Sequence, residues 1–161
     1  MWKTGHSLIK AKLRESGAPL AGEMSGHIFF NDRWYGFDDA LYVGARLCEL
    51  LAKEESSPET IFRELPDTFN TPELRLEMNE GAHHDLMTEL VANAAFPDGA
   101  GSHIDGIRVD FDDGFGLARA SNTTPTVIFR FEATTETKLN QIKSLFREQL
   151  LSLQSDLTLP F

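Results

Sequence analysis

The spacing of apolar residues in the first part of the chain predicts alternating helices and strands. Residues 7–15 carry apolar side chains at helical spacing, and Gly17 is a suitable terminator for that helix. Short apolar stretches at residues 19–21 and 28–30 are expected to be strands separated by a glycine-bounded loop, and the second strand should resume at residues 34–36. A mixed α/β arrangement is therefore expected here.

A longer helix is expected after Asp38 or Asp39, either of which can accept a hydrogen bond from the helix's first turn. Its apolar positions at helical spacing are Leu41, Ala45, Cys48 and Leu51. Cys48 lies in this apolar face, so it is expected to be a small buried hydrophobe. As the single cysteine, it can form neither an internal disulfide nor a zinc site. Pro58 favours a further short helix, because proline suits the first helical position.

The hydrophobic pattern changes after residues 66–72, where two prolines flank polar residues and mark the best candidate for a domain boundary. The elements expected beyond it are a strand at 74–78, a helix around 86–91, strands at 104–111, 115–120 and 126–131, and a helix at 135–153. The order β-α-β-β-β-α predicts an antiparallel sheet covered by two helices, an α+β domain.

The net charge of the chain limits which classes of binding partner are expected. The 161 residues carry a formal net charge of −10, with an isoelectric point of about 4.9. Such a surface repels nucleic acid and anionic membranes, so neither is expected as a partner. A small phosphorylated ligand remains compatible, because a few local donors can outweigh a distant negative field. No apolar stretch approaches the ~18 residues of a membrane span and no signal peptide is recognisable, so a cytoplasmic location is expected.

The richest cluster of polar residues is RASNTTP, residues 119–125, between two expected strands. It combines a guanidinium fork, hydroxyls, an amide and backbone N–H groups, which together suit a phosphate dianion. The candidate phosphate ligands are Arg119, Ser121, Asn122, Thr123 and Thr124. Taken alone, the stretch fits an ordinary polar turn better.

Two further stretches carry candidate chemistry. GEMSGH, residues 22–27, offers Glu23 as an acceptor for two neighbouring hydroxyls, with Ser25 beside it and His27 for proton transfer or phosphate contact. KTGHS, residues 3–7, precedes a helix whose free N–H groups favour anions. Each stretch alone is also typical of a surface turn.

The remaining histidines and the acidic pair are interpreted as structural, although the pair leaves open a metal site with few further ligands nearby. His83 and His84 have no third ligand at metal spacing and are interpreted as the exposed start of a helix. His103 is interpreted as loop surface, and Asp112 with Asp113 as a turn before a glycine.

Taken together and in this order, residues 3–7, 22–27 and 119–125 resemble the bacterial phosphomannomutase/phosphoglucomutase family of α-D-phosphohexomutases. RWYGFDD at residues 33–39 and the ending LPF at 159–161 are similar to that family as well. The resemblance extends over essentially the whole chain.

The resemblance implies roles for the individual residues. Glu23 and Ser25 would hold sugar hydroxyls O3 and O4, so glucose and mannose, which differ at C2, should both be accepted. His6 and His27 would be catalytic residues near the reacting end of the sugar. The candidate ligands in residues 119–124 would hold the phosphate that is not being transferred.

The resemblance also implies a larger parent. Family members have four domains and convert hexose 1-phosphates to hexose 6-phosphates through a phosphoserine and a bisphosphosugar, with Mg²⁺ held by an aspartate-rich loop. This sequence has no match to the phosphoserine stretch or the metal loop. Residues 1–65 would therefore be the latter part of domain 3, and residues 72–161 the complete domain 4.

Two functions follow from this interpretation. In the first, the chain is part of a phosphohexomutase, inactive alone, which works with the missing N-terminal domains; Mg²⁺ binds outside this chain, which itself holds no cofactor. In the second, it is a stand-alone phosphosugar-binding module without catalysis. The expected ligands in either case are glucose and mannose 1- and 6-phosphates and the bisphosphate intermediate.

Overall fold

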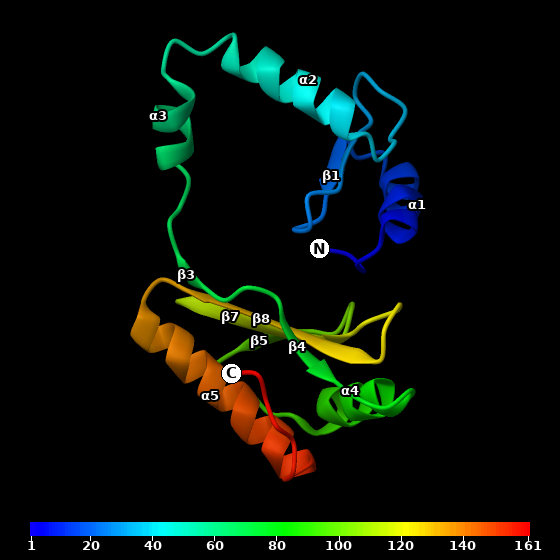
Figure 1. The fold of residues 1–161 in the computed structure, drawn as a ribbon, viewed down its shortest axis with the longest axis vertical. Helices are drawn as coiled ribbons and strands as arrows, with labels where there is room; N and C mark the ends of the chain where they lie inside the picture. The colour runs from blue at the N-terminus through cyan, green and yellow to red at the C-terminus, as the bar shows by residue number, and fades with distance from the viewer. The chain divides into compact units, whose positions relative to one another are not determined.

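Packing divides the chain between Pro66 and Asp67. The computed structural model describes residues 1–161 and separates them into two units, Met1–Pro66 and Asp67–Phe161 (Figure 1). Each unit has its own cluster of buried apolar side chains.

The first unit contains a two-stranded antiparallel sheet and three helices. Its elements are α1 (His6–Ser16), β1 (Leu20–Gly22), β2 (Ile28–Phe30), α2 (Ala40–Leu51) and α3 (Pro58–Arg63). Gly17 ends α1 in the left-handed conformation, and the Asp39 carboxylate caps α2 by accepting from the backbone N–H of Tyr42 at 3.0 Å. The expected strand at residues 34–36 does not form; this part of the chain makes only an isolated bridge between Phe29 and Asp38.

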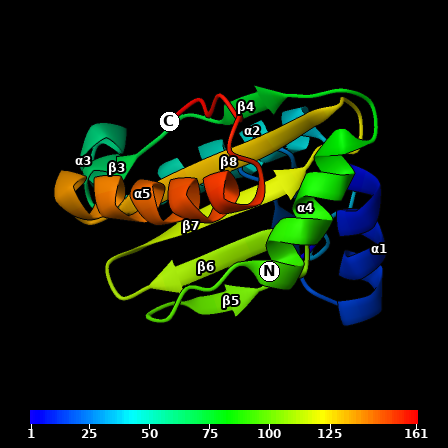
Figure 2. The same ribbon diagram turned by 90° about the horizontal axis from the view of Figure 1, so that it is seen from below.

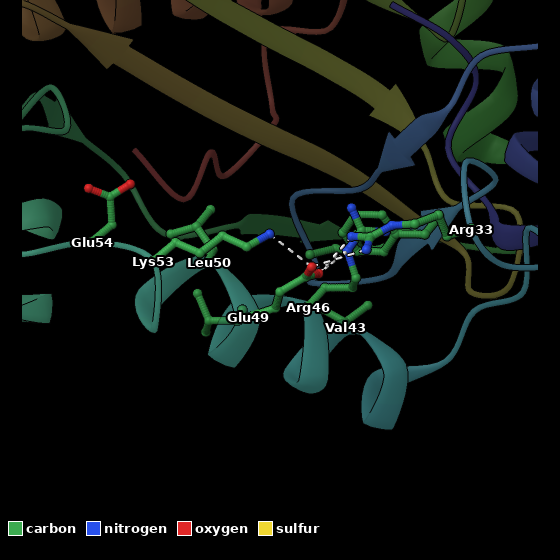
Figure 3. A pocket seen from close by; sticks show the side chains of 10 residues that line it. Arg33, Val43, Arg46, Glu49, Leu50, Lys53 and Glu54 are labelled. Carbon is green, nitrogen blue, oxygen red and sulfur yellow. Dashed lines mark hydrogen bonds and ion pairs between the residues drawn. The ribbon is translucent and has the colours of Figure 1, made fainter.

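The apolar face of α2 is not buried, contrary to the sequence-based expectation. No residue of this helix is buried, Leu41 is 89% exposed, and Cys48 is exposed as well. The helical periodicity is correct, but within the 161 residues little packs on that face. What remains is a pocket of about 510 Å³ between α2 and β2, lined by Ile28, Phe30, Val43, Leu47, Leu50 and the charged side chains around them (Figure 3).

Charged side chains form a network at this pocket. Arg33 donates to Glu49 at 2.6 Å, and Arg46 donates to Asp32 at 2.8 Å. The bond from Arg46 lowers the pKa of Asp32 to about 2, and the bond from Arg33 and then that from Lys53 lower the pKa of Glu49 to about 2. Both carboxylates therefore stabilise the folded unit most when they are ionised.

Removing one of these carboxylates should change how the chain responds to acid. The pKa of Asp32 is lower folded than unfolded, so its contribution is present above the unfolded value of about 4 and is lost as the pH falls through about 2. Asp32→Asn should lower the melting temperature near pH 7, and the difference from the unmodified chain should shrink towards pH 2. Thermal unfolding across this pH range is the measurement, with the exposed Asp67→Asn as control. A difference that is constant with pH would contradict the assignment.

The second unit is a six-stranded antiparallel sheet with two helices. Its elements are β3 (Phe69–Asn70), β4 (Leu74–Glu77), α4 (Ala82–Asn93), β5 (Ala100–Ser102), β6 (Ile107–Phe111), β7 (Gly114–Ala120), β8 (Thr126–Ala133) and α5 (Glu136–Leu153). The strand order is β3-β8-β7-β6-β5, and β4 also pairs with β8. The predicted α+β class with an antiparallel sheet and two helices is confirmed, although the short strands β3 and β5 were not predicted.

Both α4 and α5 cover the same face of this sheet (Figure 2). Alternate residues of β8 face them, so Phe129 and Phe131 are fully buried, together with Phe146 of α5. Gly116 of β7 leaves room for this packing, because a Cβ there would lie 2.3 Å from the Phe146 ring. His83 is 2% exposed, which corrects its interpretation as a surface residue, whereas His84 is exposed as expected.

Among the helices of the structure, none combines the length and apolar character that a membrane crossing needs.

The two units should differ in stability. The buried apolar cluster has three residues in the first unit and fifteen in the second. Because burial of apolar area is the main stabilising contribution, amides of β7, β8 and α5 should exchange with solvent far more slowly than those of α1, β1 and β2. Hydrogen exchange followed by mass spectrometry tests this. Equal protection of both units, in a chain shown to be monomeric, would contradict it.

Candidate functional site

The first two candidate stretches meet at the start of α1. The backbone N–H of Gly5, the residue before the helix, donates to the Glu23 carboxylate at 2.8 Å. Glu23 is held in place by the turn that joins β1 and β2, in which its N–H donates to the carbonyl of His27 and its carbonyl accepts from Gly26. Gly26 has a φ of 91°, a conformation that favours glycine. One Glu23 oxygen is thereby fixed by the backbone, and the other makes no hydrogen bond within the chain.

His27 is held by a carboxylate that the sequence analysis assigned only to helix capping. Its Nδ1 lies 2.7 Å from Oδ2 of Asp38, and both side chains are partly exposed. With the proton on Nδ1, the ring donates to Asp38 and its Nε2 is left as an acceptor for a ligand proton. A contact between residues eleven positions apart and in different local structures leaves no signal in the sequence pattern.

His6 and Ser25 complete the candidate residues of the first unit. His6 is the first residue of α1, and Ser25 lies in the turn after Glu23; both are exposed. The structure thus brings the start of α1 and the turn together through Gly5 and Glu23, and no hydrogen bond links His6 or Ser25 to the other candidates.

The third stretch forms the connection between β7 and β8 in the second unit. Ser121, 6% exposed, organises this loop: its Oγ accepts from the N–H groups of Thr123 and Thr124 at 3.3 Å each, and from the Thr124 hydroxyl at 3.0 Å. Its own N–H donates to the carbonyl of Thr126. Asn122, Thr123 and Thr124 are exposed. Ser121 therefore shapes the loop from inside by accepting from Thr123 and Thr124, while the Asn122 side chain lies exposed at the surface.

Arg119 is the last but one residue of β7, and no ion pair or side-chain hydrogen bond engages its guanidinium. Its register partner is Ile128 of β8, on the sheet face that α4 and α5 do not cover. A fixed strand therefore carries a cation next to a loop of exposed donors, which is the chemistry that a phosphate group needs.

A pocket of about 520 Å³ lies beside this loop and was not expected. Its lining includes His84, His103 and Asn122, so two histidines that the sequence analysis set aside share a pocket with the loop amide. Their positions far apart in the chain gave no signal of this.

No group of three or more His, Cys, Asp or Glu side chains in the structure is placed to hold a metal ion. The aspartate-rich loop expected for a Mg²⁺ site has no match in this sequence.

The comparisons with known proteins agree with the fold. The family model "Phosphoglucomutase/phosphomannomutase, alpha/beta/alpha domain III" matches residues 1–69, and the model for the C-terminal domain of the same family matches residues 73–149. The chain belongs to the phosphoglucomutase/phosphomannomutase family.

Individual relatives show the same likeness. A phosphomannomutase/phosphoglucomutase of Pseudomonas aeruginosa is 48% identical over 161 residues, covering all of this chain and 35% of the relative, and a phosphoglucomutase of Neisseria meningitidis is 51% identical over 150 residues, 91% of this chain and 32% of the relative. A crystal structure of a family protein from Burkholderia thailandensis has a TM-score of 0.92 at 54% identity, covering all of this chain and 34% of its own. The chain thus spans about a third of the length of these relatives.

Proposed function

We propose that the chain is part of a phosphohexomutase that interconverts hexose 1-phosphate and hexose 6-phosphate through a phosphoserine and a bisphosphosugar. The observation that carries the proposal is the match of two consecutive domains of one mutase family along the chain. In this proposal the chain recognises the sugar and a phosphate, and domains that these 161 residues do not include supply the rest. The substrates are glucose and mannose phosphates.

We assign residues 1–65 to the latter part of the family's third domain and residues 72–161 to its complete fourth domain. The change in packing between Pro66 and Asp67 supports a boundary in this region. The exposed apolar face of α2 supports the view that residues 1–65 are only a part of a domain, because a complete domain would cover it.

In the first unit, Glu23 and Ser25 hold vicinal sugar hydroxyls, and His6 and His27 act near the reacting oxygen. Fixing one Glu23 oxygen on the Gly5 N–H orients the other for a ligand hydroxyl. Asp38 holds the His27 ring so that Nε2 can take a proton.

In the second unit, Arg119, Asn122, Thr123 and Thr124 bind the phosphate that is not being transferred. Ser121 contributes by shaping the loop, because its Oγ accepts from the N–H groups of Thr123 and Thr124 and from the Thr124 hydroxyl. The exposed Asn122 side chain stays available to the ligand. Mg²⁺, which the family uses at its phosphoserine, would be held outside this chain, because the sequence has no match to the family's metal loop.

A chimera tests the proposal. The chain should replace the matching 35% of the Pseudomonas aeruginosa relative, to which it is 48% identical. We expect the chimera to convert both glucose 1-phosphate and mannose 1-phosphate to the 6-phosphates. The unmodified relative, assayed in parallel, calibrates the rates. A folded chimera without turnover, combined with phosphosugar binding by the chain itself, would favour the stand-alone binding module.

Glu23→Gln in the chimera should impair glucose and mannose substrates alike. The amide keeps the shape, but with its oxygen on the Gly5 N–H it presents a donor instead of an acceptor to the sugar hydroxyls. We expect kcat/KM to fall several-fold for both sugars. Steady-state kinetics are the measurement, with the exposed Glu55→Gln as the matched control. Loss of only one substrate would mean that Glu23 contacts the sugar at C2 and not at O3 and O4.

A further inference from the structure

The uncovered face of the second unit's sheet is rich in arginine, although the chain as a whole carries a charge of −10. The strand register shows which arginines share this face. Arg75 of β4 and Arg119 of β7 both pair with Ile128. Arg108 of β6 and Arg130 of β8 both pair with Leu117. Paired residues share a face, and Ile128 and Arg130 are two positions apart on one strand. Four of the unit's five arginines therefore lie on this face.

Two of these four cations are neutralised within the unit. Arg75 donates to Glu73 at 2.6 Å, and Arg108 makes a forked pair with Asp110. Arg119 and Arg130 enter no ion pair. This face therefore carries two uncompensated positive charges on adjacent strands.

Arg130 is the more unusual of the two. Its Nε is buried and has no hydrogen-bond partner, although a guanidinium stays charged and an N–H removed from water without an acceptor is destabilising. Glu132 lies on the same face and pairs with Phe115, so Arg130 stands between it and Arg119. Glu132 makes no ion pair with either arginine. Nothing within the unit explains an arginine at this position.

We propose that Arg130 is a second guanidinium of the phosphate subsite and binds the phosphate monoester of the ligand together with Arg119. On antiparallel strands, Arg119 and Arg130 are diagonal neighbours, with backbones about 7–8 Å apart. Two long side chains at this separation can donate to one dianion above Leu117 and Ile128. The inference rests on the proposed function, because it extends the same phosphate subsite.

The arrangement explains why both cations lack a carboxylate. Two like charges on adjacent strands repel each other, so the phosphate-free sheet is less stable than it would be with one of them neutral. A phosphate dianion between them removes the repulsion and accepts from both guanidinium groups. Arg130 is thus predicted to reduce stability without phosphate and to add stability with it.

The test uses the whole 161-residue chain, with inorganic phosphate and glucose 1-phosphate as probes. Arg130→Met removes the charge and keeps the bulk, and Arg75→Met on the same face is the matched control. We expect Arg130→Met to leave the melting temperature without phosphate unchanged or raised, and to weaken phosphate binding about fivefold in an NMR titration. Arg75→Met should weaken binding less than twofold. Arg130→Lys, which keeps the charge without the fork, should fall between Arg130→Met and the unmodified chain.

The possible outcomes distinguish failure of the Arg130 inference from failure of the proposed phosphohexomutase function. If phosphate binds in a manner that Arg119→Ala weakens but Arg130→Met does not, the inference is overturned and the phosphate subsite stands. If Arg130→Met lowers the melting temperature without phosphate and leaves affinity unchanged, Arg130 is a packing residue. If no binding depends on Arg119, the inference falls together with the subsite, whereas mutase turnover by the chimera would still support the proposed function.

Discussion

The 161-residue chain should show no mutase turnover when it is assayed alone. Phosphoryl transfer requires a phosphoryl donor, a positioned acceptor and neutralisation of the charge that develops on the transferring group. In the proposed function, Glu23, Ser25 and the Arg119 loop position the sugar that accepts the phosphoryl group, but the sequence has no match to the family's phosphoserine stretch. None of its acidic residues or histidines gather into a metal site. His6 and His27 therefore have no phosphoserine to act on.

A coupled assay measures this directly. Conversion of glucose 1-phosphate to glucose 6-phosphate would be followed with Mg²⁺ and catalytic glucose 1,6-bisphosphate supplied, beside a heat-killed sample and the full-length Pseudomonas aeruginosa relative. The expected rate equals that of the heat-killed sample. Turnover above it, at high purity and with the intact mass confirmed, would reveal a nucleophile within these residues and overturn the proposed division of labour.

The fold of the second unit could be predicted because its signals are local and periodic. Alternating apolar residues in β7 and β8 and the helical stripe of α5 correspond to surfaces that are buried against one another. The strands that were missed lack this signal. β3 has two residues, and β5 has the sequence AGS, so neither carries an apolar alternation. Their pairing is imposed by neighbouring strands and not by their own composition.

Helix α2 shows that a correct periodic pattern does not predict burial. Its periodicity predicted the helix and its Asp39 cap correctly, but burial of the apolar face, including Cys48, does not follow from periodicity. Burial depends on whether another element packs there, and the first unit offers only a two-stranded sheet. A periodic pattern therefore identifies the face that needs a partner without showing that the partner lies within the same 161 residues.

The candidate site was likewise predictable from the sequence only in part. Residue types and order were enough to select the three loops, whereas their internal contacts required coordinates. The Gly5–Glu23 hydrogen bond, the His27–Asp38 pair and the role of Ser121 inside its loop all depend on backbone geometry. The open-face position of Arg130 depends on strand register, which a single strand's sequence does not reveal.

Arg119→Ala is expected to lower kcat/KM of the chimera by at least about tenfold, for glucose and mannose substrates alike. A charge-assisted hydrogen bond contributes roughly 1.5–3 kcal/mol, and a guanidinium fork can make two of them to one phosphate. No carboxylate of the unit competes for Arg119, so its donors are available to the ligand. The exposed Asn122 and Thr123 and the proposed second guanidinium of Arg130 remain in the variant, and residual binding should come from them.

The split between kcat and KM then locates the interaction along the reaction. Because Arg119 is proposed to hold the phosphate that is not transferred, it binds substrate and transition state similarly, and most of the loss should appear in KM. The control is Arg75→Ala, which removes a cation of the same sheet face that Glu73 already neutralises, and it should change kcat/KM less than twofold. A loss confined to kcat would place Arg119 at the transferring phosphate instead. An unchanged kcat/KM in a folded chimera would remove Arg119 from the site.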